Sequence, residues 1–463
     1  MRREQQHGRT APASSLLVVD WWEKLAGASI AFAAVIRLCQ NLDLDLVVPH
    51  VQSSLLLPAP AAVSGRSWPM SAYYDISFIK NSISPRRLAT FEAWRSSALE
   101  RQPLLLAIVY GDMPRACLAA MEQQRAAAET SCPAACLAVS GIRRLEAATT
   151  SWMGIGVNGA SGFVRACVRA AEVRAAISGE EGAARLRNLV SRHPAIAILN
   201  FRRHDNGKPM LPLPQANKLR SAAIRPSRTV RNAAQRFLRL QISPSAANQG
   251  YSLVHLRSNH VAHSMFDRRR RELGGGASVA SELRKLGKHF SGVDGGGGSR
   301  SRTTSKNGIG DDVCSQRVTA CVRRLGRAAR RLAPPEATVV ASDLATFFER
   351  NQDGASHRKH AYMHDCLVPS LPSLLRWRGR TGRAFNCTWY KASFASGSNA
   401  SAASRRALFC DAGWLGLVDL TLAAGAKSFV AVAVNTPWRS AFLEWIMLLR
   451  KADGSKPSDL ITC

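Results

Sequence analysis

A histidine and an arginine two residues apart, His255 and Arg257, are the residues whose types and spacing best indicate chemistry. They end the stretch Tyr-Ser-Leu-Val-His-Leu-Arg at 251–257, which is apolar almost to its end and is typical of a buried strand. Side chains two apart on a strand lie on the same face. The guanidinium of Arg257 has a planar fork of donors that suits a phosphate. An ordinary surface arginine after a strand gives the same pattern, so both interpretations stay open.

Two further strands in the second half of the chain are expected to end on polar residues. A short apolar run at 337–341 leads to Asp343, and another at 428–434 leads to Thr436. The carboxyl ends of parallel strands meet at one edge of a sheet, where such sheets bind their ligands. Three polar strand ends at one edge therefore predict a crevice suited to a nucleotide-type ligand.

The elements that would position these residues alternate between strand and helix. Apolar side chains recur at helical spacing between the apolar runs, which is the pattern of a parallel sheet with helices on both faces. The expected elements of the second half are strands at 251–257, 337–341 and 428–434 and helices at 313–332, 414–424 and 438–450.

The first half of the chain shows the same alternation, so the expected fold class is α/β. A helix at 21–38 is followed by a strand at 44–48, which a proline ends. The further elements expected here are strands at 104–110 and 195–201 and helices at 116–128, 164–187 and 230–240.

A chain of 463 residues is too long for one ordinary core, and two domains of roughly 200 residues each are expected. We predict a basic N-terminal tail at 1–20, an N-terminal α/β domain at 21–243 and a C-terminal Rossmann-like domain at 244–463. Within the second domain, the segment 274–312 is rich in Gly, Ser and Arg. This composition is typical of a flexible insertion.

The net charge of +31 and the pI near 10.9 favour anionic partners, which include nucleic acids, acidic membranes and phosphorylated small molecules. Most of the excess is arginine in an alanine-rich chain, a pairing that coding bias also produces. Aromatic residues are 7% of the chain and do not interleave with the basic runs. The sequence therefore disfavours a nucleic-acid partner, because stacking platforms are not evident.

The sequence lacks the motifs of several common classes of binding site. No Gly-x-Gly-x-x-Gly follows a strand and no Walker-type loop occurs, which disfavours dinucleotide dehydrogenases and P-loop enzymes. The eleven cysteines include the pairs Cys132 with Cys136 and Cys314 with Cys321, but neither pair has partners at zinc-ligand spacing. No metal and no cofactor is expected.

No apolar run is long enough to predict a transmembrane segment. The best candidate, 26–38, is too short and contains Arg37, and the polar, basic start of the chain is not a clear signal peptide. Two glycosylation sequons at Asn386 and Asn399 favour a secretory compartment weakly.

The order of several short segments resembles that of the fucosyltransferase-like glycosyltransferases, which include the GDP-fucose protein O-fucosyltransferases. The stretch 254–257 resembles the His-x-Arg signature of that family, and a helix of the family's type at 226–237 precedes it. Other segments that match in order are Gly27, 46–49, 74–75, 339–343, 417–419, 429–430 and 435–440.

The resemblance implies two Rossmann-like domains facing a cleft, the GT-B-like arrangement. It further implies a glycosyltransferase that transfers fucose from GDP-fucose, a donor substrate, to a hydroxyl of a protein or glycan acceptor. The second domain is then expected to hold the sugar nucleotide and the first domain the acceptor. A location in the secretory pathway, the Golgi or the endoplasmic reticulum, is also implied.

The resemblance also assigns roles to individual residues. Arg257 is then the catalytic residue, which binds the diphosphate and stabilises charge on the departing GDP. Asp343 is expected to accept hydrogen bonds from guanine or ribose, and Thr436 and Ser440 to bind phosphate oxygens near a helix start. The implied substrate-binding residues are Gly27, His255, Arg257, Asp343, Thr436 and Ser440.

Three of these residues have a structural interpretation as well. His255 is otherwise a buried core histidine, Asp343 an N-cap of the following helix and Ser440 an exposed helix residue. The sequence identifies no general base for the acceptor hydroxyl. Asp75 is the one carboxylate beside a matched segment of the first domain, and a structural role is its competing interpretation.

Two other functions stay open, one because of departures from the family's pattern and one because of the positive charge of the chain. Ala28 and Ser29 follow Gly27 where the family has Asn and Gln, and Thr-Pro-Trp at 436–438 replaces a Ser/Thr-Phe-Ser pattern. One alternative is a catalytically inactive member that binds a glycan or a protein. The other is a basic nucleic-acid-binding protein.

Overall fold

The computed structural model describes part of the 463 residues. The described residues are 14–18, 25–48, 50–52, 67–77, 79, 88–127, 131–139, 142, 163–180, 184–202, 204–206, 208–242, 244, 250–256, 309–332, 337–342, 408, 411–433, 441–454 and 458–462.

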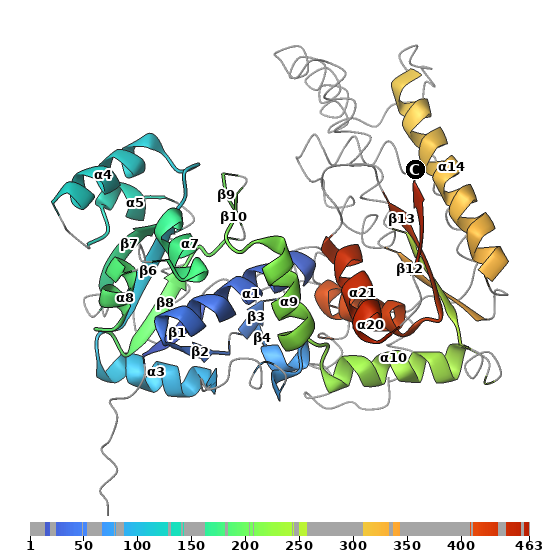
Figure 1. Cartoon of the computed structure of the whole chain (residues 1–463), viewed down its shortest axis with the longest axis horizontal. Coiled ribbons are helices and arrows are strands. Elements are labelled where there is room, and N and C mark those ends of the chain that lie inside the picture. The colour runs from blue at the N-terminus through green and yellow to red at the C-terminus, as the bar shows by residue number, and fades with distance from the viewer. Residues whose placement is uncertain are drawn as a thin grey trace, which may run out of the picture. The chain divides into compact units, whose positions relative to one another are not determined.

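The chain divides into two compact units, and the division falls at Arg228 and Thr229. Each unit contains a parallel sheet with helices packed on it (Figure 1). The expected α/β class with two Rossmann-like domains is thereby confirmed. The sequence-based boundary at 243/244 stays a prediction.

The first unit is built on a six-stranded parallel sheet with the order β5-β2-β1-β8-β6-β7. The central strands are continuous apolar runs because helices cover both faces of a parallel sheet. Every residue of β6 and β8, for example, is buried. The strands are β1 (Ser15–Val18), β2 (Asp45–Val47), β5 (Leu88–Ala89), β6 (Leu104–Val109), β7 (Val164–Arg169) and β8 (Ala195–Leu199).

In one helical layer of this unit, α7 (Ala170–Ser178) and α9 (Leu213–Ala223) both pack on α1 (Leu25–Leu42). The helix α3 (Phe91–Glu100) packs on β1 and β8. Asn41 ties α1 to α7, because its side-chain amide donates to the carbonyls of Ala176 and Ile177 at 2.9 and 2.8 Å. The other elements are α4 (Arg115–Ala126), α5 (Ala134–Leu137), α8 (Ala184–Val190), the short helix η1 (Met70–Ala72) and the ribbons β3 (His50–Gln52) with β4 (Ser67–Pro69) and β9 (His204–Asp205) with β10 (Lys208–Pro209).

Two sequence predictions for this unit are wrong. The segment 1–20 was predicted as a tail, but Ser15–Val18 forms β1 between β2 and β8. The segment 164–187 was predicted as one helix, but its first six residues form β7 and two shorter helices follow. Four apolar residues are too few to show a period, and the alanines of β7 and α7 hide the change from strand to helix.

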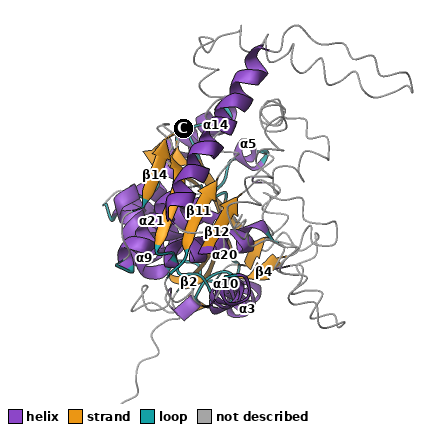
Figure 2. Cartoon of the chain, turned by 90° about the vertical axis from the view of Figure 1, so that its right-hand side faces the viewer, coloured by secondary structure: helices purple, strands orange, loops and turns teal. Residues whose placement is uncertain are grey.

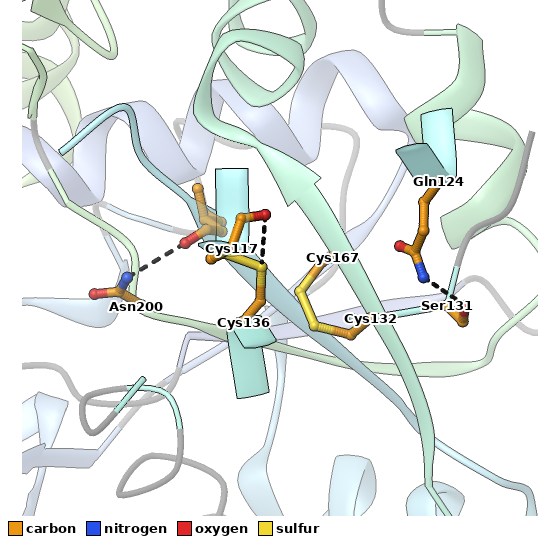
Figure 3. The surroundings of a disulfide bond; sticks show 8 residues. Cys117, Gln124, Ser131, Cys132, Cys136, Cys167 and Asn200 are labelled. Carbon is orange, nitrogen blue, oxygen red and sulfur yellow. Dashed lines mark hydrogen bonds between the residues drawn. A yellow bond between two sulfur atoms is a disulfide. The ribbon is translucent and has the colours of Figure 1, made fainter. Parts of the chain in front are cut away.

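One disulfide joins α4 to α5, and a second joins the segment before α5 to β7 (Figure 3). Cys117 is bonded to Cys136 across 19 residues, and Cys132 is bonded to Cys167 across 35 residues. The two cysteines that flank the Pro-Ala-Ala turn therefore have separate partners. Among the described residues, no group of three or more His, Cys, Asp or Glu side chains is placed to hold a metal ion.

Removing the first of these disulfides is expected to destabilise the first unit. Closing a loop of this length in the unfolded chain contributes about 3 kcal/mol, so the double variant Cys117→Ala/Cys136→Ala should lose about 2–4 kcal/mol of unfolding free energy. Chemical denaturation with and without a reductant measures this. A double variant that unfolds at the wild-type denaturant concentration would contradict the pairing.

The second unit is built on a four-stranded parallel sheet with the order β12-β11-β13-β14. Its long helix α14 packs on β11, β13 and β14. The helices α20 and α21 pack on each other, and α20 also packs on β11. Figures 1 and 2 show α14 on one face of the sheet and α20 and α21 on the other. The elements are α10 (Arg228–Gln241), β11 (Ser252–Leu256), α14 (Ile309–Leu332), β12 (Thr338–Ser342), α20 (Ala412–Gly425), β13 (Ser428–Ala433), α21 (Ala441–Ala452) and β14 (Asp459–Thr462).

The sequence predicts these elements to within a few residues, with two differences. The strand β14 was missed, and the proposed insertion 274–312 ends too late because α14 begins at Ile309. The rest of that insertion lies outside the described residues.

The start of α20 shows why the chain turns into a helix there. Asp411 precedes the helix, and its carboxylate accepts hydrogen bonds from the backbone N–H groups of Gly413 and Trp414 at 2.9 and 3.0 Å. These two donors have no partner within the helix, so the cap stabilises its first turn by about 1 kcal/mol.

Candidate functional site

The sheet of the second unit changes its winding direction between its two central strands. From β11 the chain passes through α14 to β12 on one side, and from β13 it passes through α21 to β14 on the other side. The two connections diverge, so they leave room at the carboxyl ends of β11 and β13. Open parallel sheets bind their ligands at such a switch point.

His255 lies next to this switch point. It is the fourth residue of the five-residue β11, and it pairs with Ala341 of β12 and Ala431 of β13. Its ring stacks on that of Phe442 with the centroids 5.3 Å apart, and the ring of Phe429 lies 6.5 Å away. The side chain is 7% exposed. His255 thus belongs to the core that seats the first turn of α21 against β11.

The amino end of α21 lies at the same edge as the carboxyl ends of the strands. This helix follows β13 and begins at Ala441, so Phe442, which contacts His255, belongs to its first turn. The first N–H groups of a helix have no partner within the helix, and together with the helix dipole they favour an anion. The edge thus combines a switch point with a helix start.

Four of the predicted site residues lie outside the described residues, namely Arg257, Asp343, Thr436 and Ser440. Their positions in the chain follow from the observed strands. Arg257 comes directly after the last residue of β11, and Asp343 directly after the last residue of β12. Their roles stay predictions.

Gly27 is the third residue of α1, the helix that follows β1 in the first unit. The two residues after it face the interior, since Ala28 and Ser29 are both buried. The hydroxyl of Ser29 accepts a hydrogen bond from Nε of Arg220 on α9 at 3.0 Å, and Nη1 of the same guanidinium donates to Asn217 at 2.9 Å. Ser29 therefore holds a buried arginine of α9 against α1.

Asp75 is engaged in a local turn. Its carboxylate accepts hydrogen bonds from the backbone N–H and the hydroxyl of Ser77, at 3.2 and 2.5 Å, and its own N–H donates to the carbonyl of Arg225 at 2.9 Å. The neighbouring Tyr74 forms a bridge with Pro226. These contacts fasten the segment at 74–75 to residues 225–226 of the same unit, which is a structural role.

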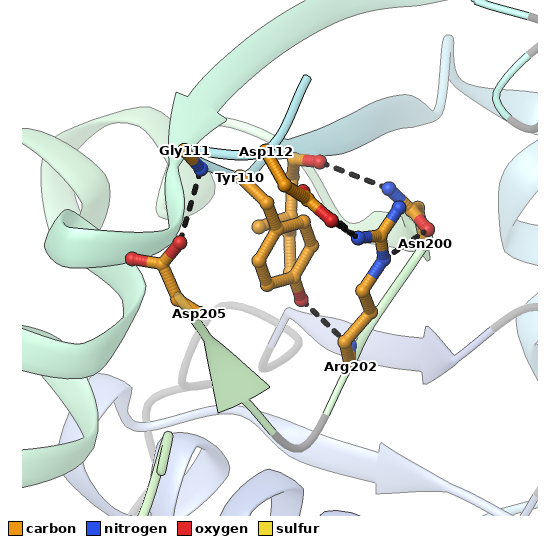
Figure 4. A network of polar contacts seen from close by, with 7 residues as sticks. Tyr110, Gly111, Asp112, Asn200, Arg202 and Asp205 are labelled. Atoms are coloured by element: carbon orange, nitrogen blue, oxygen red, sulfur yellow. Dashed lines mark hydrogen bonds and ion pairs between the residues drawn. The ribbon is translucent and has the colours of Figure 1, made fainter. Parts of the chain in front are cut away.

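A polar network that the sequence analysis missed lies at the carboxyl ends of β6 and β8 (Figure 4). Nη1 of Arg202 donates to both carboxylate oxygens of Asp112, at 2.9 and 3.0 Å, and Nε donates to Asn200 at 3.3 Å. The guanidinium carbon lies 4.7 Å from the centre of the Tyr110 ring. The network therefore holds a half-exposed cation in a fixed place on the strand edge.

Tyr110 and Asp205 fix the network in place through further hydrogen bonds and an ion pair. The backbone N–H of Arg202 donates to the Tyr110 hydroxyl at 2.6 Å, and burial raises the pKa of this phenol well above its ordinary value, so it stays neutral. On the other side, Asp205 accepts a hydrogen bond from the N–H of Gly111 at 3.0 Å and pairs with Arg174 at 3.5 Å. The carboxylates of Asp112 and Asp205 and the guanidinium of Arg202 thus lie around one buried ring.

Asn200 carries the backbone strain of this edge. Its φ of 62° is in the left-handed region, and its side-chain amide donates to the carbonyl of Ile108 at 3.3 Å. Replacement by alanine is expected to cost about 1–2 kcal/mol for the left-handed conformation, with a further loss for the missing hydrogen bond.

Thermal denaturation of Asn200→Ala and Asn200→Gly separates the two contributions. The glycine variant adopts this φ without strain and loses only the side-chain bonds, so it should be the more stable of the two. An alanine variant as stable as the glycine variant would show that φ at this position is not left-handed in solution.

The sequence contained a signal for this network. Gly111 and Asp112 come directly after one predicted strand, and Arg202 and Asp205 come shortly after another. These polar residues at strand ends are the same kind of signal as those of the second half. What the sequence lacks is the strand order that makes β6 and β8 neighbours although about 90 residues separate them.

Comparisons with known proteins give a structural likeness. No known family model and no curated protein matches the sequence. The fold is similar to that of POFUT1. Its crystal structure in complex with GDP-fucose (form I) matches with 12% identity and a TM-score of 0.46, covering 98% of this chain and 99% of that chain. The GDP complex (form III) matches with 13% identity, a TM-score of 0.44 and the same coverage.

POFUT1 is a GDP-fucose protein O-fucosyltransferase, a member of the family that the sequence motifs resemble. At this identity the likeness concerns the fold, and it assigns no role to a residue of this chain. Within the described part of the chain, no helix is both long enough and apolar enough to span a bilayer.

Proposed function

We propose that this protein is a sugar-nucleotide-dependent glycosyltransferase of the O-fucosyltransferase-like type, which transfers fucose from GDP-fucose to a hydroxyl of a protein or glycan. The observation that carries the proposal is the switch point between β11 and β13, with His255 beside it and Arg257 next in the chain after β11. An arginine that follows a strand at such a point is suited to a diphosphate.

In this proposal the strand ends of the second unit bind the donor. Arg257 neutralises the diphosphate and the charge that develops on the departing GDP, while His255 holds the first turn of α21 in place through Phe442. Asp343 accepts hydrogen bonds from guanine or ribose. Thr436 and Ser440, which lie in the chain between β13 and α21, bind phosphate oxygens.

The first unit is the acceptor side in this proposal, and Gly27 lies at the start of the helix that follows its strand β1. Since the carboxylate of Asp75 accepts two hydrogen bonds from Ser77, it is a poor general base, and we assign none. The edge network of Asp112, Arg202 and Asp205 offers polar groups to an acceptor.

The two disulfides support a location in the secretory pathway. Disulfides persist in oxidising compartments, whereas cytosolic thiols are kept reduced. The bonds between Cys117 and Cys136 and between Cys132 and Cys167 therefore favour a protein that folds in the endoplasmic reticulum or outside the cytosol. The sequons at Asn386 and Asn399, which lie outside the described residues, favour the same compartment.

A second candidate function is that of a catalytically inactive member that binds a glycan or a protein. One observation favours it. Where the family has a polar residue after the first glycine, Ser29 is buried and bonded to Arg220, so it is not presented to a ligand.

Release of the nucleoside diphosphate distinguishes the two candidates. The purified protein is incubated with GDP-fucose, GDP-mannose or UDP-glucose, and free diphosphate is measured with and without added protein or glycan acceptors. The transferase proposal predicts release from GDP-fucose that an acceptor increases. Binding of GDP-fucose without any release would favour the inactive member. No binding of any of these donors at millimolar concentration would contradict the transferase proposal.

A further inference from the structure

The helix α14 of the second unit has two chemically distinct faces. Its buried face is apolar and packs on β11, β13 and β14, and it consists of Val318, Cys321, Val322, Leu325 and Ala329. The opposite face is exposed and consists of Arg323, Arg324, Arg327, Arg330 and Arg331.

The spacing of these arginines places all five on one stripe. Their positions are i, i+1, i+4, i+7 and i+8, which lie within about 120° around a helix of 3.6 residues per turn. With a rise of about 1.5 Å per residue, the stripe is about 12 Å long. The sequence has no acidic residue between 313 and 332, so no carboxylate of this stretch of the helix offsets the charge.

Four of the five side chains are available to an external anion. Arg323, Arg327, Arg330 and Arg331 are exposed, and none of them forms an ion pair with another described residue. Like charges at such spacing repel one another and destabilise a helix. A ligand that carries several anionic groups in a row removes this repulsion and binds each guanidinium fork.

We propose that this arginine face, residues 323–331 of α14, binds a sulfated polysaccharide. A linear polysaccharide with repeated sulfate groups can bind several of the guanidinium groups along the helix at once, whereas a single phosphate cannot. The two disulfides favour this class of polyanion over nucleic acid, because they place the protein in oxidising compartments or outside the cell, where sulfated polysaccharides occur. The face belongs to the helix that covers one face of the sheet, and none of its arginines takes part in the proposed donor site, so the inference does not depend on the proposed transferase activity.

The density of charge singles out this helix among the described ones. The helix α10 is also basic, but its four arginines are spread over twelve residues, and Arg231 among them is only partly exposed. On α14 five arginines occupy nine residues.

Heparin, a sulfated polysaccharide, is the probe for this proposal. The test variant replaces Arg323, Arg327, Arg330 and Arg331 of the full-length protein by glutamine. A matched control replaces four exposed and dispersed arginines of the first unit by glutamine, namely Arg101, Arg115, Arg187 and Arg192. Both variants lose four positive charges, so only the arrangement of the remaining charges differs. Far-UV circular dichroism and the melting temperature show whether both are folded.

The expected result is a loss of heparin affinity in the test variant alone. Each lost contact lowers the slope of log affinity against log salt by about 0.7–0.9, so the slope should fall by about 3 in the test variant and by less than about 1 in the control. If the test variant does not fold, the double variant Arg327→Gln/Arg331→Gln should lower the slope by about 1.5.

Three outcomes would overturn the proposal. Equal losses in both quadruple variants would show that net charge alone binds heparin. An unchanged slope in the α14 variant would exclude this face. Tighter α14-dependent binding to double-stranded DNA or to phosphatidylserine vesicles than to heparin would show that the face serves another polyanion.

Discussion

Arg257→Ala is expected to abolish the stabilisation of this protein by GDP and to lower the rate of fucose transfer by a factor of about 10²–10³. A nucleotide present at 100 times its dissociation constant stabilises the folded wild type by about 2.7 kcal/mol. In a unit of about 200 residues this raises the melting temperature by several degrees, about 2–4 °C per kcal/mol. The alanine variant removes the cation that the proposal places against the diphosphate, so the rise disappears.

Two further variants make this result specific. Arg257→Lys keeps the charge but loses the planar fork, and it should retain part of the rise. Arg239→Ala removes an exposed arginine of α10 in the same unit and should retain all of it. A full rise in Arg257→Ala would exclude the diphosphate role of Arg257.

Arg450→Ala is expected to destabilise the second unit by about 3–5 kcal/mol and to lower its melting temperature by about 10 °C. The side chain is 2% exposed and lies on α21, where Nη1 donates to the carbonyls of Ala423, Ala424 and Ala426 at 2.9, 3.5 and 2.5 Å. These carbonyls lie at the end of α20 and have no partner within that helix. Truncation leaves them buried without a donor.

The surroundings of Arg450 explain why its loss is costly. Nε donates to Ser458 at 3.1 Å, and the hydroxyl of Tyr251 donates to the next carbonyl of the same helix end, Leu422, at 2.6 Å. Burial lowers the pKa of the Arg450 guanidinium, whereas burial raises that of the Tyr251 phenol. The charged guanidinium of Arg450 and the neutral hydroxyl of Tyr251 together cap the carboxyl end of α20, which lies beside the start of β11.

Lys451→Ala is the matched control for this prediction, because it removes an exposed cation from the next position of the same helix. It should change the unfolding free energy by less than about 0.5 kcal/mol. Urea denaturation measures both variants. Equal, small effects of the two substitutions would show that Arg450 does not cap α20.

The strands β11, β12 and β13 and the helices of the second unit were predictable because each has a clear apolar pattern, whereas β14 was missed. The runs at 337–341 and 428–434 agree with β12 and β13 to within one residue at each end. The continuous apolar character of these strands follows from helices covering both faces of a parallel sheet, and this is a local property of the sequence.

The roles of individual polar residues were less predictable because their partners are distant in the sequence. Nothing beside Arg450 in the chain indicates that it closes a helix whose carbonyls lie 24–27 residues earlier. Likewise, Ser29 meets Arg220 across 191 residues, and Arg202 meets Asp112 across 90. Such contacts depend on which helices and strands become neighbours, and local periodicity does not contain that order.

The most direct test of the account is to locate a bound nucleotide by hydrogen–deuterium exchange. The central claim is that GDP binds at the carboxyl edge of the second sheet, between β11 and β13. With saturating GDP, we predict slower amide exchange in peptides that cover 251–258 and 434–443, and unchanged exchange in peptides that cover β6 and β8. Protection confined to the first unit, or no protection in the second unit, would contradict the account.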